Sequence, residues 1–382
     1  MRRTVKFTVE RDVLSEAVNW TARTVPTRPS VPILAGVRME AADGVLTLSS
    51  FDYEISTRSE IPATVDVAGE ALVSGRLLAS IAKSLPNQPV QFTLEGPKMS
   101  LYCGTSHFTL ATMSVDEYPP LPVMPEVRGT VDAQVFAQAI AQVSVAASSD
   151  DTIPLLTGVR MEIEDDTITL LGTDRYRLAM REFKWEPAQP GISTALLVKA
   201  RVLGDVAKSM TSGGSVELAF DTEAAGAGNS LIGFVSGSKR TTSTLMDGDY
   251  PPVRRLFPDD AQIQAVVDRH ELVEAVKRVS LVAEQRTSVR LGFEDGQVNL
   301  EAGTDDNAQA SEVVAATVEG GSLTTAFNPR FLEGGLGVID TSHVRFSFTD
   351  AAKPAVITGQ KDESGDQDDS FKYLIMPIRF GI

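Results

Sequence analysis

The pentapeptide Gly-Val-Arg-Met-Glu occurs twice in this chain, at residues 36–40 and again at residues 158–162. The copies lie 122 residues apart, and the alternating apolar segment after each copy ends on an aspartate, Asp52 or Asp174, at that same offset. A third segment, residues 289–305, keeps the alternation and ends on Asp305. Landmarks that recur in order at a fixed spacing indicate tandem copies of one structural unit. We therefore expect three related domains.

Two helices are predicted in each unit, because apolar residues recur there every three to four positions and mark one helix face. The first helix precedes the alternating segment, as in RDVLSEAVNWTART, where Leu14, Ala17 and Val18 share a side. The last of the six segments holds three glycines, which lower helix propensity. The first helices are expected at residues 11–24, 133–147 and 269–282, and the second at residues 74–85, 199–210 and 328–338.

Short segments of alternating polarity fill most of the remaining sequence and predict antiparallel strands with one buried face. Tyr-Pro-Pro closes the first two units, at residues 118–120 and 250–252, where the prolines separate one unit from the next. Helices and antiparallel sheets in every unit indicate the α+β class. The three domains are expected at residues 1–128, 129–258 and 259–382.

Composition excludes several classes of protein. The apolar fraction of 42% is enough for packed cores. No apolar run approaches the roughly 18 residues that a membrane span needs. The single cysteine, Cys103, cannot form an intrachain disulfide and fits a reducing compartment. The net charge of −16 argues against a nucleic-acid partner unless the basic residues are clustered.

The sequence contains no recognisable catalytic constellation. His107 falls in the first unit, and His270 and His343 lie far apart in the third, so no histidine has a ligand partner at metal-site spacing. Asp52, Asp174 and Asp305 recur once per unit, and this repetition favours a turn-capping role over catalysis. We expect no catalytic residues, no metal and no cofactor.

Four segments carry a resemblance to a known family: RPSVPIL at 28–34, TDRYRLA at 173–179, YPPVRRLFP at 250–258 and YLIMPIRF at 373–380. With these segments in the same order, the chain resembles bacterial DNA polymerase III beta subunits, the sliding clamps. The resemblance extends over essentially its whole length. The resemblance implies three tandem clamp domains, forming half of a ring that closes as a head-to-tail homodimer. It also implies a non-enzymatic processivity factor.

Such a ring would encircle duplex DNA without sequence specificity. By the resemblance its partners would be the DNA polymerase III alpha subunit, the clamp loader complex, and other clamp-binding polymerases and repair proteins. The protein would be cytoplasmic, and nucleoid-associated when loaded.

The distribution of charge weakens the objection to a DNA partner. The six expected helices hold 11 basic and 6 acidic residues, and the rest of the chain holds 24 basic and 45 acidic residues. Basic helices in an acidic body suit a DNA tether that does not read sequence. Arg28 matches a DNA-contacting position of the family, although an ordinary surface arginine beside a proline is an equal alternative. The residues expected to face DNA are Arg28, Arg76, Lys83, Lys199, Arg201, Lys208, Lys277 and Arg278.

The resemblance also implies a hydrophobic groove between the second and third domains, where partner peptides would bind. Leucine, methionine and proline would form its floor, and arginine and threonine would orient the peptide. The family pattern has Gly-His where this chain has Arg175–Tyr176, so peptide preference is expected to differ. The expected groove residues are Leu156, Thr173, Arg175, Tyr176, Arg177, Leu178, Pro251, Arg255, Leu256, Pro354, Leu374, Met376, Pro377, Ile378 and Arg379.

For the dimer, the resemblance pairs an edge strand of the first domain with one of the third. The matching positions are Phe108 and Leu110, against Leu281 and Val282. The three expected domains carry net charges of −2, −4 and −10, which favours head-to-tail over tail-to-tail pairing.

Two other functions remain open. A clamp paralogue that confers resistance to a clamp inhibitor would be consistent with the Arg175–Tyr176 departure. A hydrolase of repeated β-rich domains with an acidic, sugar-facing cleft would need a carboxylate pair found in one unit alone.

Overall fold

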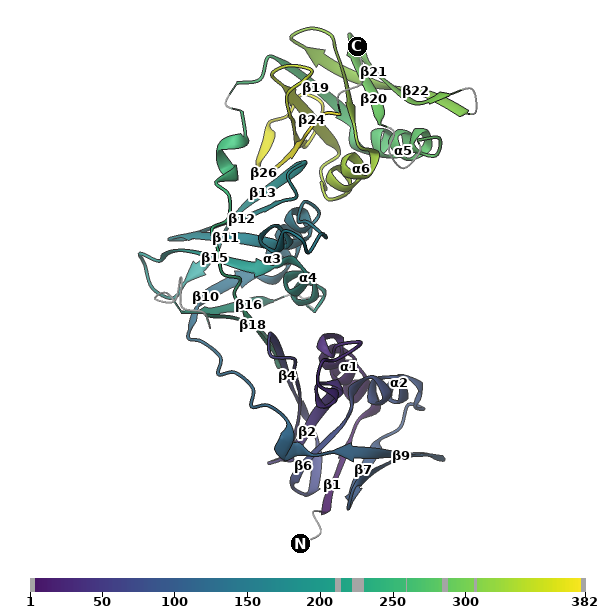
Figure 1. The fold of residues 1–382 in the computed structure, drawn as a ribbon, viewed down its shortest axis with the longest axis vertical. Coiled ribbons are helices and arrows are strands. Elements are labelled where there is room, and N and C mark those ends of the chain that lie inside the picture. The colour runs from purple at the N-terminus through teal and green to yellow at the C-terminus, as the bar shows by residue number, and fades with distance from the viewer. Residues whose placement is uncertain are drawn as a thin grey trace. The chain divides into compact units, whose positions relative to one another are not determined.

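The structure, a computed structural model, describes residues 4–209, 214–221, 230–258, 260–283, 288–305 and 308–378. The chain divides into two compact units, each built on one antiparallel sheet (Figure 1). Unit 1 contains Met1–Gln134, Glu186–Gln189 and Lys208–Leu245, and unit 2 contains Val135–Trp185, Pro190–Ala207 and Met246–Ile382. The division falls within residues 129–258, because strand pairing joins parts of that segment to each sheet. The boundaries at 128 and 258 therefore remain predictions.

Unit 1 holds a sheet of 14 strands in the order β14-β10-β16-β17-β18-β4-β3-β2-β6-β9-β8-β7-β1-β5. Its helices are α1 (Arg11–Thr21) and α2 (Gly75–Ser84), which pack against each other. Three short 3-10 helices span Ala22–Thr24, Pro32–Ala35 and Val115–Glu117. The strands are β1 (Thr4–Val9), β2 (Gly36–Ala42), β3 (Val45–Phe51), β4 (Ile55–Pro62), β5 (Thr64–Val67), β6 (Gly69–Ser74), β7 (Val90–Glu95), β8 (Lys98–Cys103), β9 (Ser106–Met113), β10 (Val127–Asp132), β14 (Glu186–Pro187), β16 (Ser215–Phe220), β17 (Leu231–Ser236) and β18 (Lys239–Thr244).

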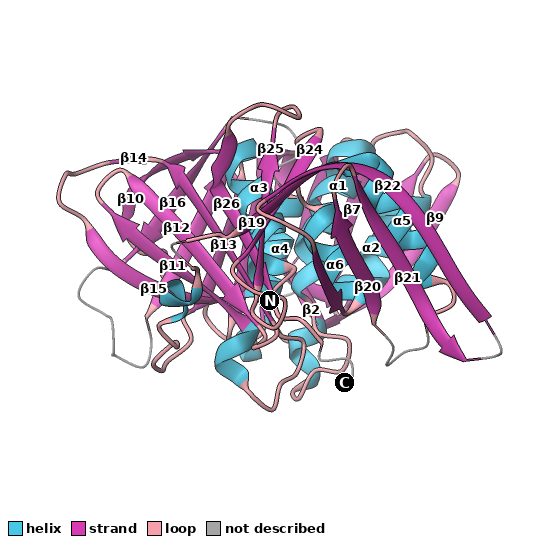
Figure 2. Cartoon of the chain, turned by 90° about the horizontal axis from the view of Figure 1, so that it is seen from above, coloured by secondary structure: helices cyan, strands magenta, loops and turns pink. Residues whose placement is uncertain are grey.

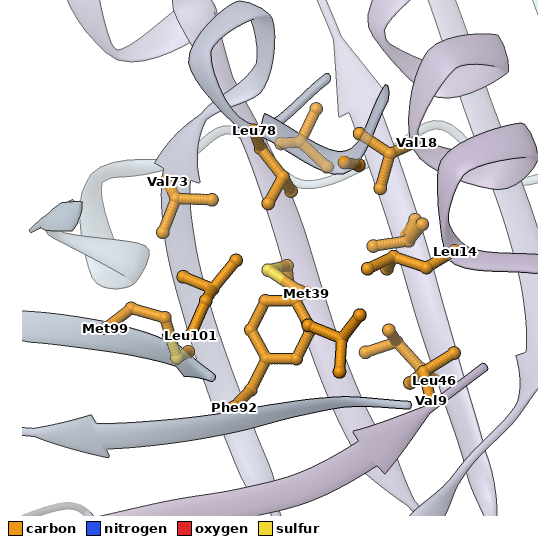
Figure 3. Packing of buried hydrophobic residues seen from close by; sticks show 14 of the residues in the cluster. Val9, Leu14, Val18, Met39, Leu46, Val73, Leu78, Phe92, Met99 and Leu101 are labelled. Atoms are coloured by element: carbon orange, nitrogen blue, oxygen red, sulfur yellow. The ribbon is translucent and has the colours of Figure 1, made fainter. Parts of the chain in front are cut away.

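The core of unit 1 lies between its two helices and the strands (Figure 3). Leu14 and Val18, four residues apart on α1, meet Leu78 of α2 above Met39 of β2. Phe92 of β7 closes the core from the opposite side and stacks on Phe7, with ring centroids 4.8 Å apart. The apolar residues that recur every three to four positions in the sequence therefore form the buried face of the helix.

Unit 2 holds a sheet of 12 strands in the order β15-β11-β12-β13-β26-β25-β24-β19-β22-β21-β20-β23. Strands β20, β21 and β22 run side by side at one end of it (Figure 2). The strands are β11 (Gly158–Glu164), β12 (Thr167–Thr173), β13 (Arg177–Lys184), β15 (Ser193–Lys199), β19 (Ile263–Asp268), β20 (Val289–Glu294), β21 (Gln297–Asp305), β22 (Ala308–Glu319), β23 (Leu323–Phe327), β24 (His343–Phe348), β25 (Ala355–Gln360) and β26 (Gln367–Ile375).

The helices of unit 2 are α3 (Ala133–Ser144), α4 (Ala200–Lys208), α5 (Arg269–Ser280) and α6 (Pro329–Gly337), of which α3 and α4 cross the division between the units by a few residues. Two 3-10 helices complete the unit, η4 (Pro154–Thr157) and η5 (Val253–Leu256). All six predicted helices are confirmed, including the glycine-containing α6. Both copies of the pentapeptide begin matching strands, β2 and β11, which confirms the repeat.

Candidate functional site

The site is organised by the tight turn that joins β12 to β13. Asp174 Oδ1 accepts hydrogen bonds from the backbone N–H groups of Tyr176 and Arg177, both at 3.0 Å. Asp52 caps the equivalent turn between β3 and β4, accepting from the N–H groups of Glu54 and Ile55. The predicted turn-capping role is thus confirmed for both aspartates, whereas the side chain of Asp305 lies outside the described residues.

Side-chain bonds fix the turn further. Thr173 Oγ1 donates to the carbonyl oxygen of Arg177 at 2.6 Å and accepts from the N–H of Arg175 at 3.2 Å. Arg175 has a φ of 79°, in the left-handed region. Each turn residue takes part in this network. The backbone that carries the Arg175 side chain is therefore held in one conformation.

Aromatic contacts join the turn to helix α6. The guanidinium of Arg177 lies 4.4 Å from the centre of the Phe331 ring. The ring of Tyr176 stacks on the same phenylalanine, with centroids 6.3 Å apart. Tyr373 of β26 anchors the helix from below, donating from its hydroxyl to the carbonyl oxygen of Phe331 at 2.8 Å. Burial raises the pKa of Tyr373 to about 12.

The end of strand β26 supplies the second wall. Leu374 pairs with Leu178 across the β13–β26 ladder, and the N–H of Met376 donates to the carbonyl oxygen of Tyr176 at 2.8 Å. Ile375 is fully buried, whereas Met376 is 40% exposed. This alternation turns the methionine side chain outward, while the isoleucine stays in the core, as the sequence predicts.

These elements surround a cavity of about 460 Å³. Its lining is apolar except for Thr173, Arg175 and Arg177. Under it lies a cluster of buried apolar residues that includes Leu171, Leu197 and Tyr250. We call this cavity the groove; it is lined by Ile153, Leu155, Leu156, Thr173, Arg175, Arg177, Leu178, Pro251, Val253, Leu256, Leu374 and Met376.

The structure brings together most, but not all, of the residues expected here. Tyr176 turns away onto Phe331, and Arg255 lines a separate cavity nearby. Pro354, Pro377 and Ile378 do not line the groove, and Arg379 lies outside the described residues. The expected residues that do line the groove are Leu156, Thr173, Arg175, Arg177, Leu178, Pro251, Leu256, Leu374 and Met376.

Sequence reasoning missed three lining residues, Ile153, Leu155 and Val253. The first two lie next to or within η4, and Val253 begins η5. A signal for the first two was present, because VPIL at 31–34 and IPLL at 153–156 recur at the 122-residue offset of the repeat. Both segments form 3-10 helices just before the pentapeptide strand.

The residues expected to face DNA lie on or beside the helices, and most of them are exposed. Arg76 and Lys83 are exposed on α2, and Arg28 is exposed in the loop before β2. Arg201 and Lys208 are exposed on α4, and Lys199, at the end of β15, is half-buried. On α5 both expected residues are paired: Lys277 with Glu274 at 2.9 Å, and Arg278 with Glu312 of β22. Their contact with DNA stays a prediction.

The expected dimer residues need one correction. Leu281 and Val282 do not lie on a strand; they form a turn at the end of α5, where their N–H groups bond to Arg278 and Val279. Helix α5 ends at Ser280, two residues before the end of the expected helix at 269–282, and the turn follows it directly. Leu281 is 85% exposed, whereas Leu110 is buried in the core of unit 1 and Phe108 packs against that core.

Within the described residues, no group of three or more histidine, cysteine, aspartate or glutamate side chains gathers as a metal site would require. Nor does any helix in the described ranges have the length and apolar character needed to cross a membrane.

Comparison with known proteins defines the class. Three family models match in tandem: the N-terminal domain of the DNA polymerase III beta subunit at residues 5–122, the central domain at 130–252 and the C-terminal domain at 254–379. The fold is therefore three tandem clamp domains of mixed helices and antiparallel sheets, as the sequence predicts.

Individual relatives agree. The chain is 52% identical to a beta sliding clamp of Streptomyces coelicolor, covering 98% of this chain and 99% of that protein. It is 44% identical to the beta sliding clamp homolog GriR of Streptomyces muensis, covering 98% and 100%. The structure matches that of a Pseudomonas aeruginosa sliding clamp bound to griselimycin with a TM-score of 0.89, at 26% identity over 99% of this chain and 100% of that one. The chain thus belongs to the DNA polymerase III beta subunit family, the sliding clamps, which are non-catalytic processivity factors of DNA replication.

Proposed function

We propose that two copies of this chain close head to tail into a ring around duplex DNA, and that the groove tethers the replicative polymerase and other partners to it. The observation that carries the tethering role is the groove itself. It combines an apolar lining with a rigid turn that presents Thr173 and Arg175. A mostly apolar lining with a few fixed polar groups is typical of ligand-binding sites, where the polar groups set the orientation of the ligand.

The partners we propose are the DNA polymerase III alpha subunit, the clamp loader and other clamp-binding polymerases and repair proteins. Exposed methionine supports several partners on one site, because its unbranched side chain adapts to different shapes. We place the protein in the cytoplasm, and its single buried thiol agrees with that location.

Two surface features support the ring. Along residues 106–111, β9 pairs with β8 alone among the described strands, so one edge is free to accept another chain. In unit 2, Leu281 exposes a large apolar side chain at the end of α5. Light scattering after size exclusion should report a dimer at micromolar concentration. The double variant Leu281→Ala with Val282→Ala should shift it toward monomer, and a monomeric wild type would refute the ring.

DNA contact should be weak and should not depend on sequence, since retention on DNA would come from ring closure. We expect two short linear duplexes of unrelated sequence to bind equally and loosely, with affinity falling as salt rises. Fluorescence anisotropy at physiological salt tests this, and tight binding to one sequence would contradict it.

For the groove, griselimycin is a direct probe, because it is bound to the Pseudomonas aeruginosa clamp that this structure matches. We expect calorimetry to show binding to this protein, and Met376→Glu to weaken it at least about tenfold by placing a charge in the apolar lining. Val123→Glu is the matched control, since Val123 is 86% exposed and does not line the groove. Equal effects of the two variants would refute the assignment.

A further inference from the structure

We propose that a second cavity beside the groove binds the carboxylate of an acidic residue in the same partner peptide whose apolar side chains enter the groove. This inference rests on the peptide-binding role proposed above. We call the second cavity the arginine pocket. It measures about 480 Å³ and is lined by Arg160, Glu162, Leu171, Tyr250, Pro251, Pro252, Val253, Arg254 and Arg255.

The arginine pocket adjoins the groove. Pro251 and Val253, at the segment that leads into η5, line both cavities. An extended peptide advances about 3.3–3.6 Å per residue. A peptide held in the groove by apolar side chains can therefore place a residue one or two positions away in the arginine pocket.

The lining of this pocket is cationic. Three arginines face one glutamate, Glu162. Arg160 binds Glu162 closely, with Nε 2.7 Å from Oε1. Arg254 is held more loosely, 3.7 Å from Glu162 and 3.5 Å from Glu182. The positive charge of the lining therefore exceeds what its own carboxylate neutralises.

Among the described residues, Arg255 is the arginine of this lining that has no ionic partner. It is exposed, and within the described residues it makes no ion pair or hydrogen bond. Arg255 was expected in the groove, but the short helix η5 directs it to this pocket while Leu256 lines the groove. A guanidinium fork offers two parallel N–H donors, which match the two oxygens of a carboxylate.

The neighbours favour a carboxylate over a phosphate. Glu162 and Glu182 stand beside Arg254, and they would repel a group of higher negative charge more strongly. Leu171 and Val253 supply apolar contact for the methylene groups of an aspartate or glutamate. The occupant is therefore a peptide that combines apolar anchors with an adjacent acidic residue.

The test uses the full-length protein and three synthetic peptides that share a Leu-Leu-Phe segment. One peptide is neutral, with Asn-Gln on both flanks; one has Asp-Glu on the N-terminal flank; and one has Asp-Glu on the C-terminal flank. We expect one acidic peptide to bind about threefold to fivefold more tightly than the neutral peptide, as befits one partly exposed ion pair. In Arg255→Glu the affinity for that acidic peptide should fall to the affinity for the neutral peptide or below it.

Arg240→Glu is the matched control, because Arg240 is exposed on β18 of unit 1 and carries the same change of net charge. It should preserve the ratio of the two affinities. If the neutral peptide binds and neither acidic peptide binds more tightly, the arginine pocket is not a carboxylate site. Displacement of the acidic peptide, but not of the neutral one, by a short DNA duplex would also overturn the proposal. If neither the neutral peptide nor griselimycin binds, the groove assignment itself fails, and the inference falls with it.

Discussion

Asp174 Oδ2 accepts a hydrogen bond from Arg177 Nε at 2.9 Å, and both side chains are more than four-fifths buried. The aspartate uses its other oxygen to hold two backbone N–H groups of the turn. One residue thus both shapes the turn and positions an arginine that lines the groove. Because the groove borders this turn, its shape depends on the ion pair.

Removing Arg177 should lower the free energy of unfolding far more than removing one partner of an exposed ion pair. Arg177→Met leaves the buried Asp174 charge without its partner, and we expect the free energy of unfolding to fall by about 3 kcal/mol. Lys184→Met is the control, since the Lys184–Asp166 pair is largely exposed and contributes little to stability. Denaturant titration of both variants measures the difference. Similar losses would show that the Asp174–Arg177 pair is not coupled to the fold.

Arg175 adopts a left-handed backbone conformation that is usual for glycine. Its φ of 79° strains any residue with a Cβ, and most strongly a β-branched one. Arg175→Val should therefore lower the free energy of unfolding by about 2 kcal/mol. In Arg175→Gly the relief of strain offsets the greater freedom of the unfolded chain, so the change should stay within about 1 kcal/mol.

Tyr53 provides an internal comparison for this prediction, because it has a φ of 74° in the equivalent turn of unit 1. Tyr53→Val should be destabilising by a similar amount, also measured by denaturant titration. If the valine variant is as stable as the glycine variant at both positions, backbone strain does not govern these turns.

The parts of the site that are local in sequence were predictable. Alternation along β26 placed Ile375 inside and Met376 outside, and the aspartate repeat marked the β12–β13 turn. Residues on the 3-10 helices were not predictable from periodicity. Over so few residues a 3-10 helix shows no pattern, and its successive side chains point in different directions. Arg255 and Leu256 therefore reach different cavities.

The expected seam between two copies shows the same limit. The family resemblance placed Leu281 and Val282 on an edge strand, whereas the structure places them in a turn that follows helix α5. In Phe108 and Leu110 the alternation was real, but it marked the inward face of β9. Which of these apolar side chains face the core depends on packing between segments distant in the sequence, and the role of the four residues in a dimer stays a prediction.

Tyr118 should make stability fall at alkaline pH. Burial raises its pKa to about 12, and its hydroxyl oxygen accepts from the N–H of Phe51 at 2.7 Å. An unfolded tyrosine has a pKa of about 10, so between pH 10 and 12 the unfolded state binds fewer protons than the folded state. The contribution of Tyr118 is therefore complete below pH 10 and is lost as pH rises toward 12.

The measurement compares wild type with Tyr118→Phe by denaturant titration at pH 8 and pH 11. At pH 8 the variant should be less stable by about 1 kcal/mol through the lost hydrogen bond. By pH 11 the wild type should have lost about 1 kcal/mol more than the variant, so the gap should close. A gap that stays constant with pH would mean that Tyr118 does not titrate in this range.

Helix α6 offers the sharpest packing test, because it contains glycines in opposite environments. A Cβ on Gly335 would lie 2.4 Å from the Tyr373 ring, whereas a Cβ on Gly337 would meet no atom within 4 Å. Gly335→Ala should push the Tyr373 ring away and lower the free energy of unfolding by about 1–3 kcal/mol. Gly337→Ala should raise it by up to about 1 kcal/mol, since alanine favours the helix. Opposite signs in denaturant titration are expected. If both variants raise the free energy of unfolding, α6 does not pack closely on Tyr373. The contact between Tyr373 and α6, which supports the turn beside the groove, would then be looser than the structure indicates.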